Sequence, residues 1–182
     1  HYILRYNKQK ADDISKYEQF RSLVLDKHDN IVAYSPAKST KLNQESLSCI
    51  SDDEKRIQIE ELVEGTMINL FFDTFKKEWE IATRSNIGGK IKYVQEPDKK
   101  SFREMFLDAC NFTELDFDTL PENHSFSFVL SHPDNIIINQ NQKNPGLSCV
   151  EAYEITNMDT ESSIRILTND EMVTILGSSG CK

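Results

Sequence analysis

The part of this 182-residue chain that most constrains its fold is the stretch from residue 57 to residue 85. Apolar and polar residues alternate here with a period of two, which is typical of half-buried β-strands. The predicted order is strand, Gly-Thr corner, strand, charged turn and strand, with the strands at Ile57–Glu64, Met67–Phe72 and Glu78–Thr83. We expect Gly65 at the corner between two strands. Leu62 and Glu64 are expected on one face of the first strand, because they are two residues apart.

Further hairpin and helix signals occur along the rest of the chain. Ser22–Asp26 and Ile31–Ser35 flank a run of turn formers and predict a hairpin. Ser101 is expected to begin a helix, because Glu104 follows it by three residues and completes a capping box. The other expected elements are a short helix at Ile14–Phe20, strands at Phe126–Leu130, Ile136–Asn139, Leu147–Ile155 and Ile164–Leu167, and a final helix capped by Thr168 or Asn169. This pattern predicts a single α+β domain over residues 1–182, with antiparallel sheets and flanking helices.

Composition narrows the setting of the protein. The sequence has no run of 18 apolar residues, so we expect no membrane span and no membrane partner. Its four cysteines are widely spaced and form no Cys-x-x-Cys pair, which favours a reducing intracellular compartment and argues against a zinc site. Because the chain lacks an initiating methionine and ends abruptly, we expect it to be truncated at both ends.

Charge is unevenly distributed along the chain. The net charge is -9, yet residues 84–103 contain six basic and only two acidic side chains. The six are Arg84, Lys90, Lys92, Lys99, Lys100 and Arg103. Such a cluster indicates either a local phosphate-binding surface on an acidic protein or a solvated loop and helix start.

Five short segments, in a fixed order and spacing, carry a resemblance to a known family. They are Arg21–Asp26, Ser35–Ser39, the Glu64-Gly65-Thr66 corner, Trp79–Ser85 and Ser127–Asn135. Together they resemble the adenylyltransferase domain of phage-type, ATP-dependent RNA ligases and the ligase-like proteins of large DNA viruses. The resemblance covers roughly residues 18–155 and implies an antiparallel nucleotidyltransferase fold of the ATP-grasp-like ligase type.

The resemblance also implies a site for ATP with Mg²⁺, or for an RNA end. It places Arg21 on the triphosphate, and Lys38 and Arg84 at basic positions of the same pocket. Glu64 falls at the acidic position of the motif. Gly65 falls at its glycine, where a missing side chain lets the backbone approach the nucleotide. Arg21, Lys38, Glu64 and Arg84 should therefore converge on one cleft.

Two departures from the family pattern concern its chemistry. The lysine nucleophile belongs two residues before Glu64, where this chain has Leu62, and a glutamate is usual at the position of Ser127. We expect Leu62 to point along the inner face of the pocket. Because leucine has no lone pair, no lysine–AMP adduct can form there. Lys38 is the only candidate for a displaced nucleophile, and no metal-ligand cluster is evident in the sequence.

Three functions remain open. The first is an RNA ligase-like domain that binds ATP, RNA ends or both, with or without catalysis. The second is a pseudoenzyme that keeps the fold to bind nucleic acid or a protein partner. The third is a structural protein of a large DNA virus particle, so that the location would be the cytoplasm or the virion. If the resemblance is coincidental, Lys38, Glu64 and Arg84 are surface charges and Gly65-Thr66 is an ordinary tight turn.

Overall fold

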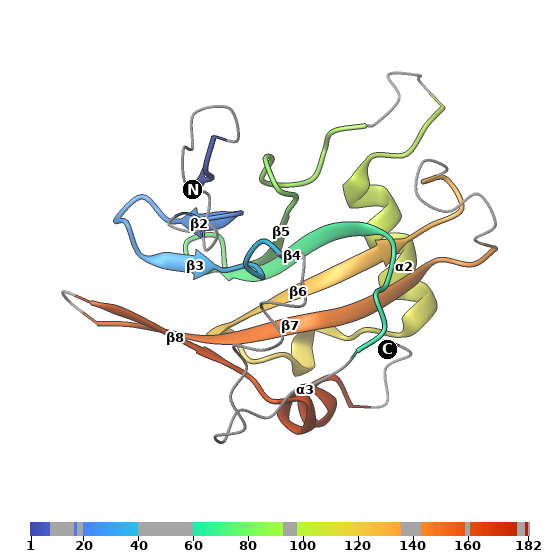
Figure 1. Cartoon of the computed structure of the whole chain (residues 1–182). Helices are drawn as coiled ribbons and strands as arrows, with labels where there is room; N and C mark the ends of the chain where they lie inside the picture. The colour runs from blue at the N-terminus through green and yellow to red at the C-terminus, as the bar shows by residue number, and fades with distance from the viewer. Residues whose placement is uncertain are drawn as a thin grey trace, which may run out of the picture.

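The computed structural model describes residues 1–7, 17, 20–39, 60–92, 98–135, 143–158, 161–177 and 181. Within these residues it is an α+β protein with two antiparallel sheets (Figure 1). The small sheet has the strand order β1 (Tyr2–Leu4), β2 (Leu23–Leu25), β3 (Ile31–Ala33). The large sheet has the order β5 (Glu78–Ala82), β4 (Thr66–Asp73), β6 (His124–Ser131), β7 (Gly146–Asn157), β8 (Ser162–Ile166). The helices are α2 (Phe102–Thr113), the short 3-10 helix η2 (Phe117–Thr119) and α3 (Asn169–Leu176).

Both predicted hairpins are confirmed. β2 pairs with β3 through Val24 and Ala33, and β4 pairs with β5 from Asn69–Ala82 to Asp73–Glu78. Both helix starts are confirmed as well. Ser101 and Glu104 form a reciprocal capping box at α2, and Thr168 and Glu171 form one at α3.

The two faces of the large sheet differ in what covers them. α2 and α3 pack on one face, where the main hydrophobic core includes Ile68 of β4, Phe126 and Phe128 of β6, and Phe106 of α2. The small sheet packs on the other face, through a smaller cluster that contains Val24, Ala33 and Phe71. Figure 1 shows β2 and β3 beside β4, with α3 away from them. One face of the large sheet is therefore a conventional apolar core, and the other is an interface between two sheets.

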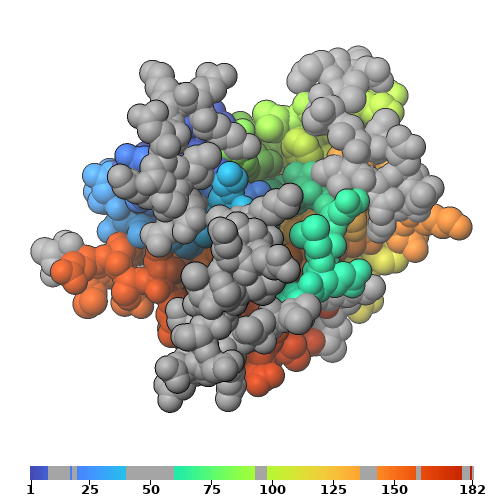
Figure 2. Space-filling view, in the orientation of Figure 1, coloured from blue at the N-terminus to red at the C-terminus, as the bar shows by residue number. Residues whose placement is uncertain are grey.

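The prediction of a strand over Ile57–Glu64 is wrong for its described part. Residues 60–64 belong to no strand, and Gly65 is a bend directly before β4 rather than a corner between two strands. Leu62 is 89% exposed and does not line the inner face of a pocket. The segment lies at the surface in Figure 2, in teal. Alternation alone does not make a strand, because a strand also needs a partner for its backbone groups.

Two other predicted elements cannot be compared with the structure. One is the helix at Ile14–Phe20, of which only Tyr17 and Phe20 are among the described residues. The other is the strand at Ile136–Asn139, which lies entirely outside them. Within the described part of the chain, no helix has the length and apolar character needed to span a membrane.

Candidate functional site

The large-sheet face toward the small sheet is polar at its centre. The register sets Asn69 of β4 opposite Ser127 of β6, and Ser127 opposite Glu151 of β7. Ser125 lies two residues before Ser127 and shares its face. Asn69, Ser125 and Ser127 are all at most 1% exposed. Buried polar side chains need hydrogen-bond partners, and some of the partners of these three residues come from the small sheet and its flanking residues.

Hydrogen bonds connect the two sheets. The Ser127 hydroxyl donates to Asn69 Oδ1 at 3.0 Å, and Asn69 Nδ2 donates to Ser22 Oγ at 3.4 Å. On the β3 side, the Tyr34 backbone N–H donates to Ser125 Oγ at 3.3 Å. Ser127, where the sequence resemblance implies a carboxylate, therefore has a structural role in this chain. It anchors the end of β3 and the start of β2 to the centre of the large sheet.

Two tyrosines extend this polar region. The rings of Tyr34 and Tyr153 meet edge to face at 5.1 Å, and the Tyr153 hydroxyl donates to the Glu151 carboxylate. Burial, and then Glu151, raise the pKa of both Tyr153 and Tyr34. Both phenols therefore stay neutral hydrogen-bond donors at neutral pH. Nearby, the Ser35 hydroxyl is buried and has no partner among the described residues.

Tyr6 contacts Arg84 through its ring and the chain next to Arg21 through its backbone. The Tyr6 backbone N–H donates to the carbonyl of Phe20, the residue before Arg21, at 2.9 Å. The guanidinium of Arg84 lies over the Tyr6 ring, 5.7 Å from its centroid. Arg84 Nε is buried and has no hydrogen-bond partner in the described part of the chain. The packing thus holds one guanidinium in place while leaving a donor unused.

The other predicted residues lie toward the same end of the sheet interface. Ser22 contacts Asn69, so Arg21, one residue earlier, lies toward the beginning of β4. β3 is antiparallel to β2, so the chain after Tyr34 runs in that direction too, toward Lys38. Glu64 is exposed and lies two residues before β4 begins. The topology therefore places Arg21, Glu64, Arg84 and the segment leading to Lys38 at one end of the interface.

Gly65 has a different role from the one the resemblance implies. A Cβ atom at this position would lie 2.5 Å from the Leu130 carbonyl oxygen and 2.5 Å from Val129 Cγ1. Glycine is thus required because the chain passes directly against β6 as it enters β4. The missing side chain serves strand packing in this structure.

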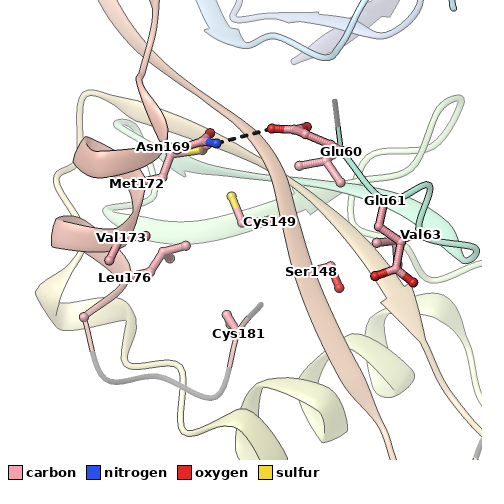
Figure 3. Close-up of a pocket in the computed structure, with 12 residues that line it drawn as sticks. Glu60, Glu61, Val63, Ser148, Cys149, Asn169, Met172, Val173, Leu176 and Cys181 are labelled. Carbon is pink, nitrogen blue, oxygen red and sulfur yellow. Dashed lines mark hydrogen bonds between the residues drawn. The ribbon is translucent and has the colours of Figure 1, made fainter. Parts of the chain in front are cut away.

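A cavity of about 390 Å³ lies near this segment, between β7, α3 and the chain before β4 (Figure 3). Its walls are mainly apolar and include Met172, Leu176 and the thiol-bearing side chains of Cys149 and Cys181. Glu60 lies at its edge, where its Oε1 accepts a 3.3 Å hydrogen bond from Asn169 Nδ2. None of the twelve described residues that line it is a lysine or arginine, so the cavity is unsuited to phosphate.

The Cys149 thiol of this cavity is also a poor nucleophile. Burial, followed by the neighbouring Cys181, raises the pKa of the Cys149 thiol to about 12. A thiol with such a pKa carries almost no thiolate at neutral pH, and the thiolate is the reactive form. Within the described residues, no group of three His, Cys, Asp or Glu side chains is placed to hold a metal ion.

Comparison of the chain with protein-family models, with curated proteins and with solved structures found no match. The sequence motifs named Arg21 and Arg84 as candidates and did not name Asn69, Ser125 or Tyr34. Their signal was present in the alternation of Ser125 and Ser127 with phenylalanines, which predicts one apolar and one polar face for β6.

Proposed function

We propose that this chain is an RNA ligase-like, nucleotidyltransferase-fold domain that binds ATP or a phosphorylated RNA end without forming a covalent adduct. The observation that carries the proposal is the Arg84 guanidinium packed on Tyr6, whose backbone pairs with the residue before Arg21, at the end of a polar interface between two antiparallel sheets. A guanidinium is suited to phosphate because it remains charged and donates several hydrogen bonds in one plane.

The surroundings support an anionic ligand at this end. Arg84 Nε and Ser35 Oγ are buried donors with no partner in the described structure, and such groups are stabilised when a ligand accepts their hydrogen bonds. The exposed Glu64 carboxylate lies at the same end of the interface. One carboxylate together with ligand phosphates is a common way for proteins to hold Mg²⁺, so Glu64 is the residue that would share the metal of an ATP–Mg²⁺ complex.

The proposal excludes adenylylation at the usual position. Leu62 has no amine, and its side chain is directed into solvent rather than toward the interface. Losing a covalent nucleophile removes nearly all of the chemical step, whereas binding through arginines can persist. The domain would therefore recognise a nucleotide or RNA end and not activate it.

A structural role in the particle of a large DNA virus is the second candidate function. The observation that favours it is again Leu62, because the loss of the nucleophile removes the requirement for an intact catalytic pocket. This role needs no phosphate ligand, and so a binding measurement separates it from the first proposal.

The test is a titration of the protein with ATP–Mg²⁺ and with two RNA oligonucleotides that differ only in a 5′-phosphate or 5′-hydroxyl. Arg21→Ala and Arg84→Ala should each weaken phosphate binding by roughly 10- to 100-fold, corresponding to about 1.5–3 kcal/mol for a charged hydrogen bond. Arg165→Ala is the matched control, because Arg165 lies on β8, at the opposite edge of the sheet from β5, and is 54% exposed. It should bind like the wild type.

The same samples are then incubated with radiolabelled ATP and a divalent metal and denatured. No label should remain on the protein. Retained label that is lost in Lys38→Ala would show a displaced nucleophile and contradict the non-covalent proposal. Absence of binding to ATP and to both oligonucleotides would favour the structural role.

A further inference from the structure

A second cavity, of about 560 Å³, lies at the other end of β4 from the candidate site. It is bounded by the end of β4, the beginning of β5, and η2 with the residues that follow it. The eight residues that line it are Phe72, Lys77, Glu78, Trp79, Phe117, Asp118, Leu120 and Glu122. A cavity of this volume is suited to a small organic group, since ligand sites typically occupy about 300–1,000 Å³.

Three aromatic residues line this cavity. Trp79 meets Phe72 at a centroid distance of 5.5 Å and an interplanar angle of 70°, and it meets Phe117 at 6.4 Å and 44°. Rings at such different inclinations form adjoining walls rather than a parallel stack. Trp79 and Phe117 are each only partly buried, so neither ring is fully covered by the core. The electron-rich faces of aromatic rings attract cations, and tryptophan does so most strongly.

Three carboxylate-bearing residues also line the cavity. Glu78, Asp118 and Glu122 all line the cavity, and all three residues are exposed. Glu78 lies 3.5 Å from the Lys76 amine. The carboxylates of Asp118 and Glu122 make no hydrogen bond or ion pair with the residues that the structure describes. Lys77 is the single cation in the lining, so the cavity has a net negative charge.

We propose that this cavity binds an alkylammonium group, such as a methylated lysine side chain or a small quaternary amine. A quaternary ammonium has no N–H that would need a hydrogen-bond acceptor, so aromatic faces can surround it while carboxylates at the edge attract its charge. An anionic ligand would be repelled by the three carboxylates. A divalent metal ion is far smaller than the cavity and prefers oxygen ligands to aromatic rings.

Lys77 provides an internal test of this assignment. Lys77 lines the same cavity, and its positive charge would compete with a bound cation through charge repulsion. Lys77→Gln should therefore tighten binding, by about threefold at low salt, whereas loss of a carboxylate should weaken it. Opposite effects from neighbouring substitutions cannot result from a general loss of folding.

The first experiment uses the only tryptophan of the chain, Trp79, as a fluorescence reporter. The protein is titrated with tetramethylammonium, with neopentyl alcohol as a neutral analogue of similar shape, and with sodium chloride at matched ionic strength. Saturable quenching by tetramethylammonium alone is the expected result. Peptides that carry trimethyl-lysine or unmodified lysine, and free choline, then distinguish a protein-borne group from a small free amine.

The second experiment repeats the tetramethylammonium titration on variants whose fold is checked by circular dichroism. Phe117→Leu should weaken binding about tenfold, and Asp118→Asn or Glu122→Gln should weaken it by about three- to fivefold. Glu161→Gln is the matched control, because Glu161 is an exposed carboxylate between β7 and β8, outside this cavity. Equal binding of neopentyl alcohol, no binding of tetramethylammonium by calorimetry, or unchanged binding in both carboxylate variants would each overturn the proposal.

Discussion

Gly65 gives the sharpest test of how the segment before β4 is held. In Gly65→Ala, the new methyl group would lie 2.5 Å from both the Leu130 carbonyl oxygen and Val129 Cγ1. Val129 can change its rotamer, but Leu130 O belongs to the backbone of β6, which pairs with β4 from Thr66 onward. Relieving the contact therefore requires a shift of one strand against the other.

The expected cost follows from these contacts. Overpacking in a close-packed region costs about 1–3 kcal/mol, and a clash with backbone belongs at the upper end of that range. Replacing glycine by alanine also restricts the unfolded chain, which returns about 0.4–1 kcal/mol. The net loss in the free energy of unfolding should be about 2 kcal/mol, or roughly 4–8 °C in Tm for a domain of this size.

The assay is urea denaturation followed by the fluorescence of Trp79, with Val129→Ala and the double variant completing a double-mutant cycle. Val129→Ala removes only one of the two contacts of the new methyl group. In the double variant it should therefore recover part of the stability lost in Gly65→Ala, with a coupling energy between the two substitutions above about 0.5 kcal/mol. A Gly65→Ala protein as stable as the wild type would refute the steric argument. If that variant also lost ATP binding, Gly65 would instead serve nucleotide approach.

Two further predictions concern chemistry and pH. Leu62→Lys introduces a lysine at the position where the resemblance implies the nucleophile. The variant should keep its free energy of unfolding within about 0.5 kcal/mol of the wild type and form no AMP adduct, because the side chain at this position is 89% exposed and lies outside the interface. A covalent label at this lysine would contradict the described geometry. Glu80 is buried, which by itself would raise its pKa, but the Ile81 N–H and the Arg103 guanidinium outweigh burial and lower the pKa below 4.5. The lowered pKa means that ionised Glu80 stabilises the fold above about pH 4.5 and that this stability is lost on acidification. The free energy of unfolding of Glu80→Gln should therefore fall less steeply than that of the wild type between roughly pH 5 and pH 3. Arg103→Ala should lose about 2 kcal/mol of its free energy of unfolding at pH 7, measured in denaturant titrations. An identical pH slope in wild type and Glu80→Gln would show that the ion pair contributes nothing to acid stability.

The local elements of this protein can be predicted from its sequence alone. The hairpins at β2–β3 and β4–β5 follow from alternation on either side of turn formers, and the starts of α2 and α3 follow from capping boxes that span three residues. These signals are readable because the interacting groups are close along the chain. The same reasoning failed at residues 60–64, where alternation occurs without a strand.

Tertiary structure decided which residues form the candidate site. Asn69 meets Ser22 across 47 residues, and Ser127 meets Tyr34 across 93 residues, so no local pattern specifies either contact. Sequence motifs named Arg84, but only the tertiary fold packs its guanidinium on Tyr6. Sequence also named Gly65 for a ligand, whereas the fold uses it to pass against β6. A side chain's neighbours on its own strand are fixed by a period of two, but its neighbours across two sheets depend on how those sheets pack.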